Sequence, residues 1–240
     1  MIREFEDELQ RAKLEALAEF AAGAGHEINN PLATILGRTE LLLRRIGRVV
    51  PTGEAAEATR DLNVIAGQVQ RIREMIGDLM LFARPPVPRL APCELNAVVE
   101  STIAAVHATA RSHQVEIQTR LTRNRPVLAD HAQLSVVVSE LLRNAVQAVP
   151  SGGRVEVSTS NLVGDGASPV RLTISDNGPG LSEADLQHLF DPFYSGRQAG
   201  RGLGFGLCKC WRIAQSHGAS LRVAVRPEGG VEATVDWPSA

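Results

Sequence analysis

The sequence predicts two structural parts, a helical hairpin followed by an α+β domain. Residues 1–84 contain only two prolines, Pro31 and Pro51, and repeat apolar side chains every three or four residues, which is the spacing of one helix face. Residues 85–92 contain four prolines, so this segment cannot be helical and is expected to act as a short, semi-rigid linker. From residue 93 to residue 240, helical stretches alternate with short runs of alternating apolar and polar residues, which favour strands.

The first part is expected to fold as two long helices joined by a turn at Pro51-Thr52-Gly53. Its apolar stripe comprises Leu14, Leu17, Ala21, Ala24, Ile28, Leu32, Ile35, Leu36, Leu42 and Ile46, then Leu62, Ile65, Val69, Ile72, Ile76, Leu79 and Phe82. Two such helices form an antiparallel hairpin. A lone hairpin leaves much of this stripe in water, whereas two hairpins paired into a four-helix bundle bury it. We therefore expect a homodimer built on a dimeric four-helix bundle.

The second part is expected to form an α+β sandwich. Helices are predicted near 94–111 and 130–149, with a third over 207–216. Five strand-like runs are predicted at 115–119, 154–159, 170–174, 220–225 and 231–235. Their alternation is typical of a sheet that packs one face on a core and leaves the other solvated.

Composition excludes several classes of protein. With 44% hydrophobic and 22% charged residues and a net charge of −2, the chain is an ordinary globular protein without a general attraction to nucleic acid or anionic membranes. Its three cysteines, Cys93, Cys208 and Cys210, lack the spacing of a disulfide framework or a zinc site. No signal peptide or long apolar run is present, so we expect a cytoplasmic location and no membrane contact from this chain.

Two glycine clusters in the second part have the chemistry of a nucleotide site. The segment 176–180, Asp-Asn-Gly-Pro-Gly, follows an apolar run, and its carboxylate is suited to accept a hydrogen bond from an exocyclic amine; it is equally an ordinary turn sequence. The segment 200–207 opens a helix with glycines, and the unpaired backbone N–H groups of such a loop suit a phosphate.

A third element lies on the helix predicted over 130–149. Glu140 and Asn144 are one turn apart and share a helix face. Beside a phosphate site, their oxygen atoms are suitable ligands for Mg²⁺. The alternative is a polar stripe on a half-buried helix.

In this order, the three elements resemble the GHKL (Bergerat) ATPases, and more closely the ATP-binding catalytic domain of histidine kinases. The resemblance implies that Asn144 is the metal-binding residue of the N box. It implies that Asp176 reads the adenine amino group, within a first glycine box that includes Gly178 and Gly180. Residues 190–194, which include Phe193, resemble the phenylalanine box that leads into the ATP lid, and Gly202, Gly204 and Gly206 resemble the second glycine box.

The lid segment shows one retained feature, and the N box shows one departure. Arg197 stands where relatives often carry a lysine, so a cation near the γ-phosphate is kept. The family usually has Asn at the first N-box position, where this chain has Glu140. In hydrolytic GHKL relatives a Glu at this position activates water, so Glu140 raises the expectation of direct ATP hydrolysis.

His26 differs from the other five histidines in its surroundings. It lies about 200° round the helix from Ala24 and Ile28, so its ring is expected to point away from the apolar stripe. Pro31 cannot donate a hydrogen bond to the Glu27 carbonyl, and a loosened or kinked helix is expected there. A neutral imidazole nitrogen can attack phosphorus in line while Glu27 accepts or orients the proton on the other nitrogen.

Residues 26–32, His-Glu-Ile-Asn-Asn-Pro-Leu, resemble the H box of the dimerisation and histidine-phosphotransfer domain of sensor histidine kinases. The resemblance implies that His26 is the phosphoacceptor, Glu27 the general base, and Asn30 the residue that orients water in phosphatase activity toward a partner. It implies a protein histidine kinase of a two-component system, with ATP and Mg²⁺ as cofactors. The implied partner is the receiver domain of a response regulator, which takes the phosphoryl group on an Asp in a phosphorelay of signal transduction.

Two rival functions stay open at the level of sequence. One is a GHKL ATPase whose hydrolysis drives a conformational change, which Glu140 favours and the His26 segment opposes. The other is a non-catalytic, nucleotide-gated dimer that serves as a scaffold. Transfer within a subunit and between subunits are both compatible with the hairpin, and no sensory domain is recognised in the sequence.

Overall fold

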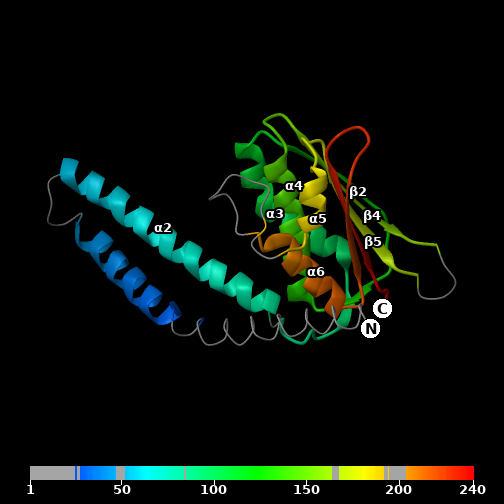
Figure 1. Ribbon diagram of the computed structural model, residues 1–240, viewed down its shortest axis with the longest axis horizontal. Helices are drawn as coiled ribbons and strands as arrows, with labels where there is room; N and C mark the ends of the chain where they lie inside the picture. The colour runs from blue at the N-terminus through cyan, green and yellow to red at the C-terminus, as the bar shows by residue number, and fades with distance from the viewer. Residues whose placement is uncertain are drawn as a thin grey trace. The chain divides into compact units, whose positions relative to one another are not determined.

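The computed structural model describes residues 25, 28–46, 52–83, 85–163, 168–191, 194 and 204–240 (Figure 1). The chain divides into two compact units, Met1–Pro85 and Pro86–Ala240. A helical first unit followed by an α+β second unit is the architecture that the sequence predicts.

The described part of the first unit includes the helical residues 28–46 and the long helix α2 (Thr52–Ala83), drawn in blue and cyan in Figure 1. Leu32 is buried together with Val69 and Ile76, which come from α2. Leu36 and Met80 extend this small core. Thr52 and Gly53, which we expected in the turn, instead belong to the first turn of α2, while Pro51 lies outside the described residues.

A second set of apolar side chains in this unit is exposed to solvent. Among the described residues, large apolar side chains with at least 39% exposure are Ile28, Ile35, Leu41, Leu42, Val64, Ile65 and Ile72. Several of them belong to the stripe that the sequence predicts to be buried. One hairpin therefore covers only part of its own apolar surface.

The second unit contains a five-stranded mixed sheet with the strand order β2-β4-β5-β7-β6. Its strands are β2 (Glu116–Leu121), β4 (Arg154–Asn161), β5 (Val170–Asp176), β6 (Ser220–Val225) and β7 (Val231–Trp237). β2 runs parallel to β4, and the other neighbouring pairs are antiparallel. All five strand runs predicted from sequence are present, although most extend one or two residues further.

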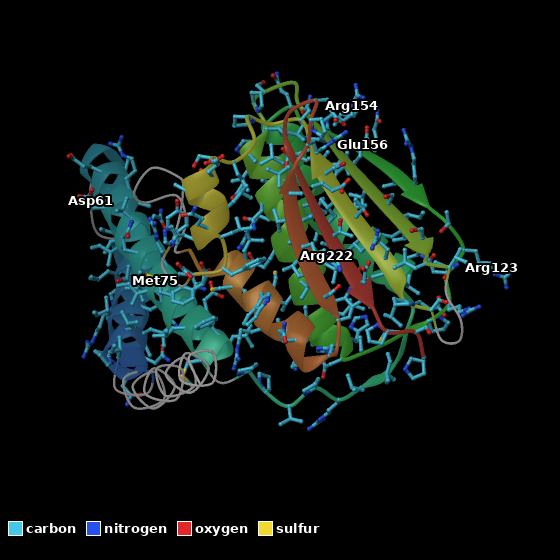
Figure 2. All side chains as sticks on the ribbon, turned by 45° about the vertical axis from the view of Figure 1, so that its right-hand side comes forward. Asp61, Met75, Arg123, Arg154, Glu156 and Arg222 are labelled. Atoms are coloured by element: carbon cyan, nitrogen blue, oxygen red, sulfur yellow. The ribbon has the colours of Figure 1, made fainter. Side chains whose placement is uncertain are left out.

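Helices α3 (Leu95–Ser112), α4 (His131–Ala148) and α6 (Gly206–Ser216) cover one face of this sheet (Figure 1). The core between the layers includes Leu134, Val138, Leu142, Val155, Val157, Leu172, Ile174, Ile213, Val235 and Trp237, each no more than 2% exposed. Polar and charged side chains occupy the opposite face, where Figure 2 labels Arg222 on β6 and Glu156 on β4. This one-sided burial is the expected sandwich arrangement.

A small second sheet pairs β1 (Ala91–Cys93) with β3 (Val127–Ala129), antiparallel. The sequence does not predict either strand, because three residues are too short to show a periodicity. Ala91 and Pro92, which we assigned to the linker, are therefore part of the second unit's secondary structure. Within the described part of the chain, no helix is long and apolar enough to cross a membrane.

Candidate functional site

The central face of α4 brings two of the predicted site residues together with the start of α6. Glu140 is buried and Asn144 is half-buried, one helical turn further on. Gly206, the first residue of α6, lies directly against both: a Cβ atom at Gly206 would be 3.0 Å from Glu140 Oε2 and 3.5 Å from Asn144 Nδ2. The absence of a side chain at Gly206 thus allows α6 to begin in contact with the polar residues of α4.

Glu140 is held by two cations. Lys209 Nζ, on the first turn of α6, donates to Glu140 Oε1 at 2.9 Å. Arg143 Nη2 donates to the other oxygen, Oε2. The Lys209 and Glu140 side chains are 6% and 9% exposed, so this is a buried ion pair between α4 and α6. Both carboxylate oxygens of Glu140 are thus already occupied as hydrogen-bond acceptors.

Asp176 is the last residue of β5 and is 5% exposed. Its Oδ1 accepts hydrogen bonds from the backbone N–H groups of Gly178, at 2.9 Å, and Val231, at 3.3 Å. Burial raises the pKa of the Asp176 carboxyl, and these two hydrogen bonds oppose that rise. Among the described residues both hydrogen bonds end on Oδ1, which orients the carboxylate and leaves Oδ2 for a ligand.

Glycines allow the chain to pack tightly around Asp176. A Cβ atom at Gly178 would lie 2.9 Å from Asp176 Oδ1 and 3.0 Å from the carbonyl oxygen of Ala148, at the end of α4. Gly230, in the β6–β7 hairpin, has φ +88°, and a Cβ there would lie 1.9 Å from the Asp176 carbonyl oxygen. The first glycine cluster is therefore packed between the end of α4 and this hairpin. Gly180, also predicted, lies beside the same hairpin with φ +84°.

The short helix α5 (Glu183–His188) fixes the segment that enters the lid region. Asp185 closes a capping box with Ser182 and accepts a hydrogen bond from Tyr194 Oη at 2.8 Å. Three predicted residues, Phe193, Arg197 and Gly202, lie outside the described residues. The described chain resumes at Gly204, which has φ +70° and lies two residues before the start of α6.

The predicted phosphoacceptor segment is described only in part. His26 and Glu27 lie outside the described residues, and the helix is continuous from residue 28 through Pro31 to residue 46. Asn30 is exposed, and its backbone carbonyl accepts a hydrogen bond from Thr34 Oγ1 at 3.2 Å. Gly25 is buried, and a Cβ there would lie 3.4 Å from Ile76 Cγ2, so it marks a close approach to α2.

The gathered residues fit a nucleotide and, in part, a metal ion. The α4 helix connects Asn144 to Ala148, which contacts the Asp176 turn, and α6 begins over Asn144, so three predicted motifs meet along one helix. A buried carboxylate with one oriented oxygen suits an amine donor. Asn144 offers an amide oxygen to Mg²⁺. Glu140 fits a metal ion less well than Asn144 does, because Lys209 and Arg143 each donate a hydrogen bond to one of its oxygens.

Two family models match the chain in the order of its two units. Residues 16–86 match the His Kinase A (phospho-acceptor) domain. Residues 129–240 match the histidine kinase-, DNA gyrase B- and HSP90-like ATPase domain. Fold, site and matched domains thus define a class of protein in which a phosphoacceptor hairpin is joined to an ATPase-type domain.

Curated proteins narrow this class. The chain is 30% identical over 230 residues to the signal transduction histidine-protein kinase AtoS of Escherichia coli (strain K12), an alignment that covers 95% of this chain and 36% of AtoS. The chain belongs to the histidine kinases and carries their catalytic core. It spans about a third of the length of AtoS.

Solved structures agree on the fold. Full-length ShkA in complex with AMPPNP superposes with a TM-score of 0.77 at 23% identity, covering 92% of this chain and 46% of the ShkA chain. Histidine kinase ThkA in complex with the response regulator protein TrrA gives a TM-score of 0.67 at 21% identity, covering 99% of this chain and 66% of that chain. A helical hairpin followed along the chain by an α+β domain is therefore a fold already seen in histidine kinases.

Several residues that shape the site were not predicted from sequence. Lys209 was overlooked, although a lysine on the apolar side of a short helix is itself a signal that a buried partner exists. Gly230 and the Val231 N–H group lie more than fifty residues beyond Asp176 and belong to a hairpin without any nucleotide motif. His217, in the turn that follows α6, is buried, and its Nε2 accepts a hydrogen bond from the backbone N–H of Asp130 at 3.1 Å.

Proposed function

We propose that this chain binds ATP in the second unit, transfers the γ-phosphoryl group to His26, and then passes it to an Asp of a response regulator. The observation that carries the proposal is the convergence of Asn144, Asp176 and Gly206 on α4, in a chain that also contains a matched phospho-acceptor domain. The chain therefore combines a nucleotide site with an acceptor histidine.

The residues divide the reaction between them. Asp176 orients the adenine by accepting a hydrogen bond from its amino group on Oδ2. A neutral His26 nitrogen forms a bond to the γ-phosphorus in line, while the bond to the β–γ bridging oxygen breaks and ADP leaves. Glu27 accepts or orients the proton on the other imidazole nitrogen. Asn144 would hold Mg²⁺, which would neutralise part of the phosphate charge.

The exposed apolar side chains of the first unit support a homodimer. Ile35 is 44% exposed and Val64 is 62% exposed, and they belong to the set of seven large apolar side chains on this hairpin. Pairing with a second hairpin removes this surface from water and completes a four-helix bundle. A dimer in turn places two acceptor segments and two nucleotide units in one molecule.

A response regulator is the partner that the acceptor chemistry requires. A phosphohistidine has a high-energy P–N bond, and a carboxylate oxygen of the regulator displaces the imidazole. The structure of ThkA in complex with the regulator TrrA supports such a partner. Asn30, four residues after His26, is exposed on its helix, which supports a role in orienting the water that hydrolyses the regulator's aspartyl phosphate to Asp and inorganic phosphate.

The test is incubation of the chain with Mg²⁺ and γ-labelled ATP, comparing wild type with His26→Gln. We expect an acid-labile, alkali-stable label on the wild type and none on the variant. His113→Gln, at an exposed histidine in the second unit, is the matched control and should keep the label. A wild type that stays unlabelled while releasing phosphate overturns the kinase proposal.

A further inference from the structure

We propose that Lys209 is a positioning residue that withholds the Glu140 carboxylate from nucleotide chemistry, so that ATP in this site is directed to phosphoryl transfer and not to hydrolysis. This inference rests on the proposed function, because it concerns how the same nucleotide site is tuned. It assigns a role to Lys209 and removes Glu140 from the candidate catalytic residues.

The first step is the environment of the carboxylate. A base that takes a proton from water needs an oxygen lone pair directed at that water. Glu140 Oε1 accepts from Lys209 Nζ at 2.9 Å, and Oε2 accepts from Arg143 Nη2. Glu140 is buried, so few directions of approach are left to a water molecule. In this geometry a water molecule therefore has little access to the carboxylate oxygens.

The second step is the difference between the two cations. The Arg143 side chain is 50% exposed and pairs with Glu140 within one turn of α4. Exposed pairs of this kind contribute little and are easily exchanged for water. The Lys209 side chain is 6% exposed and comes from a different helix. A buried, hydrogen-bonded ion pair is much harder to separate, so Lys209 is the cation that holds the Glu140 carboxylate in place.

The third step is the position of the pair inside the site. Gly206 packs on Glu140 Oε2 and lies beside Asn144, and Lys209 follows Gly206 by three residues on α6. The ion pair thus joins the two helices that carry the N-box residues and the end of the second glycine cluster. Any rotation of the Glu140 side chain toward the nucleotide requires Lys209 to release it first.

The experiment measures phosphate release from ATP in a His26→Gln background, where no phosphohistidine forms. Four chains are compared: the background alone, and the background with Glu140→Gln, with Lys209→Met, or with both substitutions. Nucleotide binding and thermal unfolding are recorded for each. The double variant removes both charges of the pair together, so unlike either single substitution it leaves neither Glu140 nor Lys209 as a buried charge without its partner.

We expect the background chain to release phosphate slowly, and we expect Glu140→Gln to leave this rate unchanged. Lys209→Met should raise the rate of phosphate release by roughly tenfold. This is less than the roughly 10²- to 10⁴-fold contribution of a fully available general base, because Arg143 still contacts one oxygen of Glu140. Adding Glu140→Gln to Lys209→Met should return release to the background rate. A purely structural role for Lys209 predicts the opposite sign, since a loosened site turns over more slowly.

Two results overturn the inference. One is loss of phosphate release on Glu140→Gln alone, which makes Glu140 the base despite its partners. The other is a Lys209→Met chain that binds nucleotide but releases phosphate no faster than the background. Failure of the proposed function is seen separately, as an unlabelled wild-type chain in the γ-labelled ATP assay, because the present comparison does not depend on the acceptor histidine.

Discussion

The carboxyl group of Asp176 is buried at the end of β5, and burial raises its pKa above the usual value. A carboxyl whose pKa is raised in the folded state binds protons more tightly there than in the unfolded chain. Its ionised form therefore lowers stability at neutral pH, and protonation restores that stability as pH falls through the raised pKa. Such a site is retained for ligand binding at a cost to the apo protein.

We predict that Asp176→Asn stabilises the apo chain and abolishes tight nucleotide binding. The Asn oxygen can still accept from the backbone N–H groups of Gly178 and Val231, but the charged acceptor for the adenine amine is lost. Affinity for ATP should fall about 10- to 100-fold, the value of one hydrogen bond to a charged group. Thermal unfolding at pH 7 with and without ATP checks both parts. Asp61→Asn, at an exposed carboxylate on α2, should change neither.

Gly229 and Gly230 form a matched pair in the β6–β7 hairpin. Both have positive φ, +96° and +88°, but a Cβ at Gly229 meets nothing within 4 Å, whereas one at Gly230 would lie 1.9 Å from the Asp176 carbonyl oxygen. Gly229→Ala should thus cost only the backbone strain of about 1–2 kcal/mol. Gly230→Ala should cost clearly more and weaken ATP binding, because the Asp176 turn must move. Urea unfolding of the two variants measures the difference, and equal losses would contradict this geometry.

At the scale of elements, contacts at the N-terminus of α4 fix the position of this helix, which carries Asn144. Asp130 caps it, with its carboxylate accepting from the backbone N–H groups of Arg89, Ala132 and Gln133. The hydrogen bond from Arg89, followed by that from Gln133, lowers the pKa of this carboxyl. The end of α6 joins here too, through His217. One residue thus connects the segment before β1, α4 and α6.

We predict that Asp130→Ala destabilises the second unit by about 1–2 kcal/mol at pH 7, the usual value of an N-cap. Because the pKa of Asp130 is lower in the folded state, its carboxylate stabilises the fold at pH values above the unfolded pKa of about 3.9. This stabilisation is lost as the pH falls below that value. The difference in the free energy of unfolding between wild type and Asp130→Ala should therefore decrease below about pH 4. Asp130→Asn keeps a capping oxygen, so it should lower the free energy of unfolding at pH 7 by less than Asp130→Ala does. Urea unfolding at pH 7 and pH 3 tests this, and a gap that does not change with pH would contradict it.

Much of this fold was predictable because the elements are periodic over many residues. The long helices α3, α4 and α6 and the five strands of the larger sheet followed from apolar spacing, whereas α5 was not predicted because six residues are too few to show a helical period. Asp176 and Asn144 were suggested by short local motifs. The Lys209–Glu140 pair could not be predicted, because the two residues are 69 positions apart and only packing of α6 on α4 brings them together. For the same reason sequence suggested Glu140 as a metal ligand or base, whereas its oxygens are held by cations.

At the scale of the whole molecule, the hairpin presents more apolar surface than a single chain covers. Leu32, Val69 and Ile76 are buried within one hairpin, but Ile35 and Ile65 are both 44% exposed. Burial of each large aliphatic side chain contributes about 1.5–3 kcal/mol. A second copy of the hairpin is the surface of matching chemistry, which gives the chain a reason to associate.

We predict that Ile35→Asp combined with Ile65→Asp converts the homodimer into a monomer, because two copies of each carboxylate would then face an apolar seam without partners. Sedimentation equilibrium across a range of protein concentrations measures the change. Val163→Asp, at a fully exposed apolar residue of the second unit, should leave the dimer intact. The monomeric variant should still bind ATP, since Asn144, Asp176 and Gly206 all belong to one second unit. A wild type that is monomeric would refute the homodimer. A double variant that stays dimeric would place the dimer contact outside this apolar face.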